Sequence, residues 1–374
     1  MRKIKFCFQP LRTDIIVWRK LTYDLIFPVI SNKKYIVMDT DRFIHISLIG
    51  MIESIGLLMR ALMSKSNIIG KLIAHHSNMQ KFKYLVHLII SGSYILGSAP
   101  KVVITDCDNH LEYQLLDFIL YNRIKFVTIQ NGNRPNIDPI NHSNGLYKYH
   151  QTIGFHSCFA ALSSYWADAY NKSRVDIVES FVLGSLNLNY YLYCEKRPRR
   201  KVFDVCVVAD SDITDVATKK ISQLINNYVH EYGITVCLAF KQTVDNVEYY
   251  NKCKELFGDC ALLVPRYYPS SSLYLSLCSE VTISKRSTLL TEALGMGRKI
   301  YPVNLDSGIF APSDLLPFSS VDPDQNEFNS KLFKLLMMPD DEYFIKYKKQ
   351  IQKVKAYDHS HTPYERITEL LSVL

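Results

Sequence analysis

Two aspartates in the first half of the sequence are placed for acid–base or nucleophilic chemistry. Asp106 and Asp108 end the β-branched run that begins at Val102, and they precede a segment with helical spacing. A carboxylate in that position could act as a base on a substrate hydroxyl or as a nucleophile at an anomeric carbon. Asp108 is our preferred candidate and Asp106 the competing one. Either could instead serve only as the N-cap of the helix that follows.

A group of polar residues surrounds these aspartates and the end of the next predicted strand. Its members are Asn109, Gln130, Asn131, Gly132 and Arg134. Because the carboxyl ends of parallel strands meet at one edge of a sheet, we expect this group and the aspartates to line the same edge of a cleft. Alternatively, Asn-Gly forms an ordinary turn and Arg134 is a surface charge.

The Asp106-x-Asp108 spacing could also chelate a divalent ion on a diphosphate. We predict no metal, because a helix N-terminus later in the chain can bind phosphate without one. His75, His76 and His87 have no acidic partners at ligand spacing, so they do not indicate a metal site either.

The clearest functional segment is VTISKRSTLLTEALGMGRKIYPVN, which begins at Val281 and is typical of a strand, a polar turn, a helix and a second strand. Ser287 or Thr288 can cap the helix, so that its free N–H groups and positive dipole end could bind a phosphate. Glu292 lies too far from Thr288 for a capping box and could accept hydrogen bonds from ribose hydroxyls. These residues could also serve only the helix, which two glycines then end.

Three further residues follow predicted strands and extend the candidate site. Lys241 comes after the strand predicted at 235–239, where it could meet a phosphate of the same ligand or be an ordinary exposed lysine. Gly184 and Ser185 end a strand of the first half, where a wall of the cleft would lie, although Gly-Ser also forms plain turns.

Two segments carry a resemblance to known families. The later one resembles the C-terminal half of GT-B glycosyltransferases, whose donor-binding helix begins with small hydroxyl residues followed by Glu-Ala and a Gly-bounded turn. The matching residues are Ser287, Thr288, Glu292, Ala293, Gly295 and Gly297, with Ser271, Ser272 and Tyr274 in the helix before them. The earlier one resembles bacterial surface-carbohydrate (capsule and O-antigen) biosynthesis proteins. Its matching residues are Asp108, Asn109, Ile129, Gln130, Asn131, Gly132 and Arg134.

The resemblance implies a glycosyltransferase that moves a sugar from a nucleotide-activated donor to a polysaccharide, lipopolysaccharide or lipid-linked glycan acceptor. The donor would bind to the second domain and the acceptor to the first, with the nucleotide sugar as co-substrate and no other cofactor. Neither the sugar nor the base follows from these residues. A sugar-nucleotide epimerase or hydrolase of the same fold carries a similar helix, and a scaffold of a glycan-assembly complex that has lost its chemistry is a third alternative.

The elements that would position these residues alternate between short β-branched runs and longer helical segments, which indicates parallel sheets covered by helices. We predict an α/β protein of GT-B type, with two Rossmann-like domains facing each other across a cleft and a C-terminal helical cap over 327–374. A polar, Pro-containing stretch at 187–201 predicts the boundary, giving an acceptor-side domain at 1–190 and a donor domain at 191–374.

The individual elements are predicted from apolar spacing. The predicted strands are 35–38, 102–105, 125–129, 152–155, 181–183, 202–209, 235–239, 261–264, 280–284 and 299–303. The predicted helices are 46–63, 71–90, 110–121, 160–170, 217–232, 245–256, 271–278 and 287–296.

Composition sets the remaining expectations. The 374 residues are 48% hydrophobic and 21% charged, which fits two globular domains. Nine dispersed cysteines and the lack of a convincing signal peptide favour the cytoplasm. A net charge of +8 favours anionic partners, with possible peripheral contact with the membrane. Nucleic acid is not expected, because no zinc-finger, RNP or basic-stripe pattern occurs. The apolar stretch 45–63 contains Glu53 and Arg60, so we expect a buried or interfacial helix there.

Overall fold

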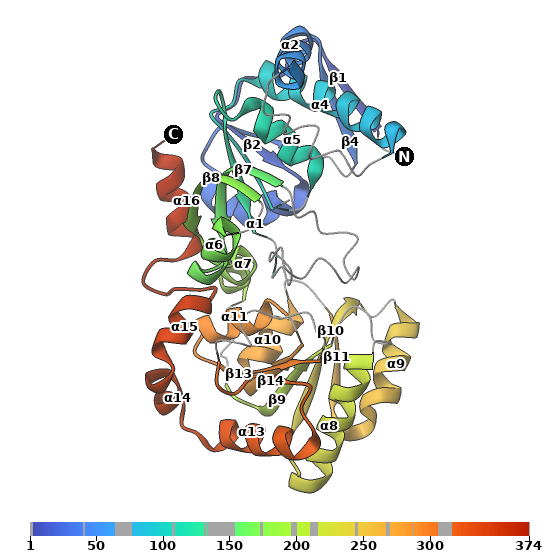
Figure 1. Ribbon diagram of the computed structural model, residues 1–374, viewed down its shortest axis with the longest axis vertical. Helices are drawn as coiled ribbons and strands as arrows, with labels where there is room; N and C mark the ends of the chain where they lie inside the picture. Colours follow the sequence, from blue (N-terminus) through green and yellow to red (C-terminus); the bar gives the residue numbers. More distant parts are fainter. Residues whose placement is uncertain are drawn as a thin grey trace. The chain divides into compact units, whose positions relative to one another are not determined.

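A computed structural model describes residues 3–39, 42–63, 77–106, 108, 110–130, 132, 154–172, 175–195, 200–209, 216–243, 246–266, 270–285, 287–305 and 316–373. The chain forms two compact units, each with a six-stranded parallel sheet (Figure 1). Unit 1 comprises Met1–Asn131, Ile137–Leu183 and Tyr364–Leu374, and unit 2 comprises Gly132–Asn136 and Gly184–Pro363. The predicted pair of Rossmann-like sheets with C-terminal helices is confirmed.

The sheet of unit 1 has the strand order β3-β2-β5-β6-β7-β8, with all neighbours parallel. Strands β2 and β5 are buried over their whole length because helices cover both faces of the sheet. The strands are β2 Ile15–Trp18, β3 Tyr35–Met38, β5 Val102–Thr105, β6 Lys125–Ile129, β7 Gly154–Ala161 and β8 Val175–Val182. A separate parallel pair consists of β1 Lys3–Cys7 and β4 Phe43–Ser47.

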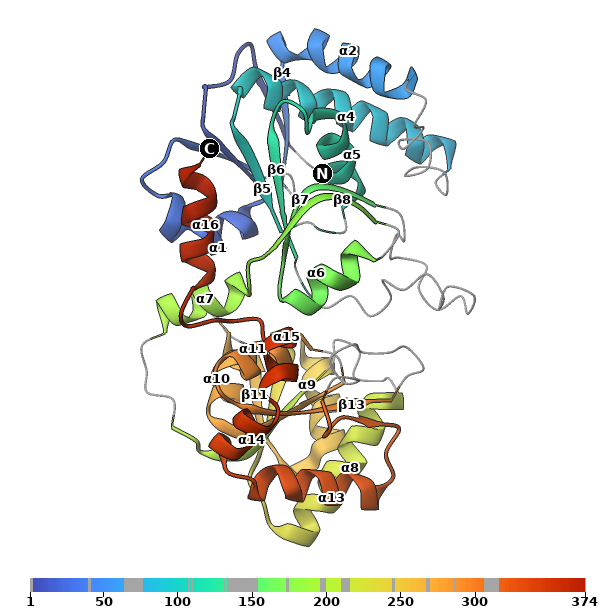
Figure 2. The same cartoon turned by 60° about the vertical axis from the view of Figure 1, so that its left-hand side comes forward.

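The helices of unit 1 lie on both sides of its sheet, α4 and α5 on one side and α1 and α16 on the other (Figure 2). They are α1 Lys20–Ile30, α2 Ile49–Met63, α4 Asn78–Ser98, α5 Leu111–Leu120, α6 Ser164–Asn171 and α16 Pro363–Ser372. Hydrogen bonds tie helix α16 to this unit, among them one from Tyr364 Oη to the Leu25 carbonyl and one from Arg366 to the Val182 carbonyl.

The sheet of unit 2 has the order β11-β10-β9-β12-β13-β14, which is the strand order of dinucleotide-binding Rossmann folds. Its strands are β9 Phe203–Val208, β10 Val236–Thr243, β11 Leu262–Arg266, β12 Ser279–Ser284, β13 Lys299–Asn304 and β14 Ser320–Val321. Its helices are α7 Leu186–Cys194, α8 Val216–Tyr232, α9 Val247–Phe257, α10 Ser271–Leu277, α11 Leu289–Gly295, α13 Gln325–Met337, α14 Asp340–Lys346 and α15 Lys348–Val354, with a 3-10 turn, η2, at Gly258–Cys260. Helix α8 packs on α9 and α13, and α10 packs on α11.

The predicted strands 35–38, 102–105 and 125–129 are confirmed at both ends. The helix predicted at 46–63 begins only at Ile49, because β4 continues to Ser47 and pairs with β1. The helix predicted at 71–90 is α4, which Ser77 and Gln80 start with a capping box, and residues 71–76 lie outside the described residues. The helix predicted at 160–170 begins at Ser164, because β7 runs through Ala161.

The stretch predicted as a linker, 187–201, contains most of helix α7. Contacts within the chain divide the two units between Leu183 and Gly184 and assign α13–α15 to unit 2 and most of α16 to unit 1. As limits of folding domains, residues 1–190 and 191–374 stay a prediction.

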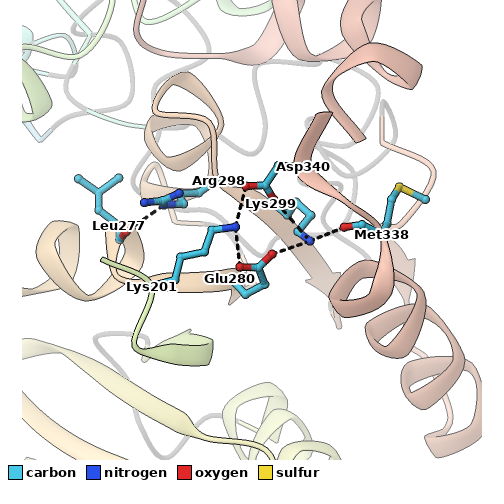
Figure 3. Close-up of polar contacts among 7 residues, drawn as sticks. All are labelled: Lys201, Leu277, Glu280, Arg298, Lys299, Met338 and Asp340. Carbon is cyan, nitrogen blue, oxygen red and sulfur yellow. Dashed lines mark hydrogen bonds and ion pairs between the residues drawn. The ribbon is translucent and has the colours of Figure 1, made fainter. Parts of the chain in front are cut away.

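A buried lysine fixes the amino ends of β12 and β13 (Figure 3). Lys299 is 0% exposed, and its Nζ donates to the Met338 carbonyl at 2.7 Å and lies 2.9 Å from Glu280 Oε1. Lys201, just before β9, lies 2.6 Å from both Glu280 and Asp340. The cluster therefore connects two neighbouring strands with the start of α14, at the edge of the sheet opposite to the ends of β12 and β13 where ligands of such folds bind.

Candidate functional site

The carboxyl end of β12 lies where the strand order of unit 2 reverses. Strands β9 and β12 are neighbours, and successive strands add outward from them in opposite directions, through β10 to β11 and through β13 to β14. Ligands of open α/β sheets bind in the crevice at such a point, beyond the carboxyl ends of the strands. Ser284 at the end of β12, with Lys285, Ser287 and Thr288 after it, therefore lies at the edge of the sheet where ligands of such folds bind.

Ser287, and not Thr288, caps the helix that follows. Ser287 Oγ accepts a hydrogen bond from Leu289 N at 3.3 Å, and Ser284 Oγ accepts one from Ser287 N at the same distance. Thr288 has helical backbone angles, and its side chain makes no capping hydrogen bond. The helix begins at Leu289 and has the dipole direction that was predicted, with Ser287 at its positive end.

Glu292 projects from α11 into a buried position next to Ser185. It is 7% exposed, and its Oε1 accepts a hydrogen bond from Ser185 Oγ at 2.5 Å. Burial raises the pKa of Glu292 to about 7, and the hydrogen bond from Ser185 opposes that rise only in part. Ser185 Oγ also accepts a hydrogen bond from Leu188 N and so caps α7. Two residues that the sequence assigned to different roles, the cleft wall and the donor-binding helix, therefore contact each other.

The chain segment at Ala356 and Tyr357 packs against both of these elements. Ser185 N donates to the Ala356 carbonyl at 2.6 Å, and Ala356 N donates to the Thr291 carbonyl at 2.9 Å. Gly295 is required where the segment passes, because a Cβ on it would lie 2.7 Å from Tyr357 Cβ and 2.8 Å from Tyr357 N. The position of Glu292 relative to Ser185 is thus fixed by a third segment of chain from the C-terminal part.

Gly184 and Gly297 have backbone angles that favour glycine. Gly184 has a φ of 96°, and a Cβ there would lie 3.0 Å from the Ala356 carbonyl oxygen. Gly297 has a φ of 72° and follows the last turn of α11, where Arg298 N donates to the Ala293 carbonyl. Gly297 ends α11 as predicted, in the left-handed conformation after the C-cap, whereas Gly295 is still part of the helix and allows the close approach of Tyr357.

Sequence reasoning missed Lys285 in this site. Lys285 directly follows β12 and is 7% exposed. Its neighbour in the chain is Ser284, whose Oγ accepts the hydrogen bond from Ser287 N. Lys285 is therefore a nearly buried lysine at this edge of the sheet, two residues before Ser287 in the chain. Its signal in the sequence was the run Ser-Lys-Arg-Ser immediately after an apolar strand.

The corresponding edge of unit 1 holds Asp106. The order of strands reverses there between β2 and β5, and Asp106 directly follows β5. Asp106 Oδ1 accepts a hydrogen bond from Thr22 Oγ1 at 2.6 Å and lies 3.7 Å from the Arg19 guanidinium. Arg19, which sequence reasoning missed, follows β2 with a φ of 85°, a conformation that costs energy for a residue with a side chain. Strain of this kind is common at functional sites.

Asp108 is nearly buried and contacts a different set of groups from Asp106. Its Oδ2 accepts a hydrogen bond from Tyr170 Oη at 3.3 Å. Its backbone carbonyl accepts one from Gln114 Nε2 at 3.0 Å. Buried His156 forms a further hydrogen bond with the Asp108 backbone, and burial lowers the pKa of this histidine to about 3, so that it is neutral.

Neither aspartate caps α5. The N-cap of this helix is His110, which makes no capping hydrogen bond through its side chain. The alternative that Asp106 or Asp108 serves only as the N-cap is therefore wrong, and their carboxylates contact Arg19, Thr22 and Tyr170 instead.

Gln130 has a structural contact at the end of β6. Its Oε1 accepts a hydrogen bond from Leu162 N at 3.0 Å, which joins the end of β6 to the residue after β7. Gly132 is half-buried, and a Cβ on it would meet nothing within 4 Å. The predicted residues Asn109, Asn131 and Arg134 lie outside the described residues, and Lys241 is described only by its backbone in β10.

Two observations bear on where other ligands could bind. Among the residues that the structure describes, no group of three or more His, Cys, Asp or Glu side chains could hold a metal ion. A hollow of about 470 Å³ in unit 2 is lined by Lys201, Asp204, Tyr228, Tyr232 and Phe333, among others. It lies at the amino ends of β9 and β12, opposite to the edge that binds ligands in such sheets, so we do not assign the candidate site to it.

No protein-family model matches this sequence, and no curated protein matches it significantly. Solved structures do match over nearly the whole chain. The Staphylococcus aureus MnaA–UDP structure covers 100% of this chain and 98% of that chain, with 12% identity and a TM-score of 0.53. The Methanocaldococcus jannaschii UDP-GlcNAc 2-epimerase, in complex with UDP-GlcNAc and UDP, covers 96% and 99% with 12% identity and a TM-score of 0.52.

A UDP-forming synthase is also among the similar structures. The α,α-trehalose-phosphate synthase (UDP-forming) of Burkholderia vietnamiensis covers 98% of this chain and 100% of that chain, with 9% identity and a TM-score of 0.50. At such identities the likeness shows the fold. The chain has the GT-B-like fold, with two Rossmann-like units.

Proposed function

We propose that the protein binds a nucleotide sugar at the carboxyl end of β12 and transfers the sugar to a hydroxyl group of a surface-glycan acceptor. The observation that carries the proposal is the cluster of Ser287, Glu292 and Ser185 at the point where the strand order of unit 2 reverses. The fold supports it, because the similar structures named above include one with UDP and one with UDP-GlcNAc.

Each residue of the cluster has a role in this proposal. The start of α11 and the buried Lys285 stabilise the negative charge of the leaving phosphate, which is the main electrostatic demand of the reaction. Glu292 accepts hydrogen bonds from the ribose hydroxyls, exchanging its contact with Ser185 for contacts with the ligand. Lys241 contacts a phosphate. Asp108 in unit 1, with Asp106 as the alternative, deprotonates the acceptor hydroxyl.

A panel of nucleotides tests the binding step. Thermal unfolding of the full-length protein is measured with UDP, GDP, CMP and dTDP, and one of them should raise the midpoint at concentrations well above its dissociation constant. A midpoint that none of the four nucleotides changes contradicts the proposal and favours a scaffold that has lost its chemistry.

A second candidate function is epimerisation of a nucleotide sugar. It is favoured by the UDP-GlcNAc 2-epimerase among the matches, which covers nearly all of this chain. The two reactions differ in their need for an acceptor. Incubating the protein with the nucleotide sugar alone should leave the sugar unchanged if the protein is a transferase, whereas conversion without any acceptor would assign it as an epimerase or hydrolase.

A further inference from the structure

Helix α2 carries an exposed apolar face that no part of unit 1 covers among the described residues. The face consists of Ile49, Ile52, Ile55, Met59, Leu62 and Met63, which we call the α2 surface. At 100° per residue these six side chains fall within one continuous sector of the helix. Ile52 is 84% exposed and Met63 is 72% exposed. A helix on the surface of a soluble domain normally carries polar residues on this side.

The opposite side of α2 accounts for its packing. The helix lies antiparallel to α4, which is visible in Figure 2. Small residues bring the two helices together: a Cβ on Gly50 would lie 1.9 Å from the Ser93 carbonyl oxygen, and one on Gly92 would lie 2.6 Å from Ser54 Oγ. One face of α2 therefore packs against α4, and the α2 surface lies on the other side of the helix.

Neighbouring elements extend the apolar character. Ile49 N donates to the Phe8 carbonyl at 3.3 Å, so the start of α2 lies beside Phe8, whose side chain is 69% exposed. Met79 and Phe82 in the first turns of α4 are also exposed. Because α2 and α4 run antiparallel, these two residues lie near the end of α2 that carries Met63.

The charges around the α2 surface have one dominant sign. The described residues of the elements that form it, 3–8, 42–63 and 77–90, contain six basic residues and one acidic residue. The basic residues are Lys3, Lys5, Arg42, Arg60, Lys81 and Lys83. The one acid, Glu53, is paired with Arg123 of unit 1, and Arg42 lies 3.9 Å from Asp39, just before the counted residues, so both pairs contribute little net charge and five basic residues remain. An apolar face with a basic surround is complementary to a negatively charged lipid surface.

We propose that the α2 surface binds the surface of an anionic phospholipid bilayer. The apolar side chains enter the boundary between head groups and acyl chains, and the lysines and arginines around them contact lipid phosphates. Among the described residues no helix is long and apolar enough to cross a membrane. The proposal does not depend on the nucleotide-sugar site, which lies in unit 2.

Sedimentation with lipid vesicles tests the proposal. The full-length protein is mixed with vesicles of phosphatidylcholine alone or of phosphatidylcholine with phosphatidylglycerol. We expect it to sediment with the mixed vesicles and far less with phosphatidylcholine. The double variant Ile52→Glu/Met59→Glu should lose binding by at least about tenfold, because two side chains can no longer enter the lipid. The matched control Ile345→Glu changes a 75% exposed isoleucine of α14 and should bind as the unchanged protein does.

A second variant tests the charge contribution without altering an apolar side chain. Lys81→Gln/Lys83→Gln should weaken binding to the mixed vesicles by roughly fivefold for each charge removed, whereas Lys348→Gln/Lys349→Gln on α15 should have no such effect. Absence of binding to the mixed vesicles overturns the proposal, as does equal binding by both unchanged protein and the Ile52→Glu/Met59→Glu variant. A dimer in equilibrium sedimentation that becomes a monomer in this variant would also overturn it, by assigning the α2 surface to a second copy of the chain.

Discussion

Ser185 Oγ donates a hydrogen bond of 2.5 Å to Glu292 Oε1, and this contact joins the start of α7 to α11 in unit 2. Both residues are nearly buried, and Ser185 at the same time accepts from Leu188 N. One oxygen of the carboxyl group is therefore held by Ser185, and burial gives the group a raised pKa.

The first prediction concerns nucleotide binding by Glu292. Glu292→Gln retains the shape of the side chain but loses the charged acceptor, so we expect nucleotide affinity to fall by roughly tenfold to a hundredfold. The measurement is the dissociation constant of the nucleotide that raises the thermal midpoint most. Glu248→Gln, at an exposed acid of α9 paired with Lys252, is the control and should bind nucleotide as the unchanged protein does. Unchanged affinity in Glu292→Gln would mean that Glu292 only supports the contact between α7 and α11.

The second prediction concerns pH and Asp117 in the core of unit 1. Burial raises its pKa to about 7, opposed by hydrogen bonds from Ser157, and among the described residues its Oδ1 has no hydrogen-bond partner. The pKa of Asp117 is higher in the folded chain than in the unfolded chain, so the unfolded chain loses this proton at a lower pH. Asp117 therefore lowers the free energy of unfolding as the pH rises from about 4 to about 7. Asp117→Asn should therefore raise the free energy of unfolding at about pH 8.5, by an amount on the order of 4 kcal/mol at most.

Urea unfolding at about pH 4.5 and about pH 8.5 checks this prediction. The gain in Asp117→Asn should be much smaller at the lower pH, because the folded chain keeps its proton there and the pH lies only slightly above the pKa of the unfolded chain. Asp168→Asn, at an exposed position of α6, is the control and should have little effect at either pH. A loss of stability in Asp117→Asn at the higher pH would contradict the assignment, and would mean that the amide leaves an unpaired donor in the core.

The elements whose ends were predicted correctly are strands in which the run of apolar residues is sufficient to set both ends. Strands 102–105 and 125–129 consist almost wholly of residues that are buried on both faces of the sheet, so their ends coincide with the ends of the run. Strand β2 is equally buried but spans only Ile15–Trp18, close to the start of the chain, and was not predicted. Arg19 was missed for the same reason, because its position follows from that strand.

The contacts of the candidate site depend on tertiary structure. Ser185 and Glu292 are 107 residues apart in the sequence. The local sequence pattern predicts a separate role for each residue, but it does not indicate that their side chains form a hydrogen bond. Helix α7, with the sequence LNLNYYLYC, has no clear helical period and was predicted as part of a linker. Its buried residues Leu188 and Tyr191 pack into the core of unit 2, which only the folded chain provides.

The third prediction separates the two aspartates of unit 1. Asp108→Asn removes a base that we expect to act on the acceptor hydroxyl, so turnover should fall by about 10² to 10⁴ while nucleotide affinity is unchanged. Asp106→Asn should have a smaller effect on turnover and a larger one on stability, since Asp106 contacts Arg19 and Thr22. Turnover and the urea midpoint are measured for both variants. If the two effects are reversed, Asp106 is the base.

The fourth prediction concerns the lysine at the amino ends of β12 and β13. Lys299→Met removes a fully buried charge that contacts Glu280 and the Met338 carbonyl, while Lys201 keeps its own contact with Glu280. Breaking a buried ion pair commonly costs about 3–5 kcal/mol, and the remaining contacts of Lys201 should place the loss near the lower end.

Urea unfolding of Lys299→Met and of Lys252→Met measures this loss. Lys252 forms an exposed ion pair with Glu248 on α9, and pairs of that kind contribute about 0–1 kcal/mol. The two variants remove the same charge and introduce the same side chain, so the difference between them reports the burial of Lys299. Equal losses would mean that the introduced methionine side chain packs as well as the lysine did and that the network of Figure 3 adds no stability to unit 2.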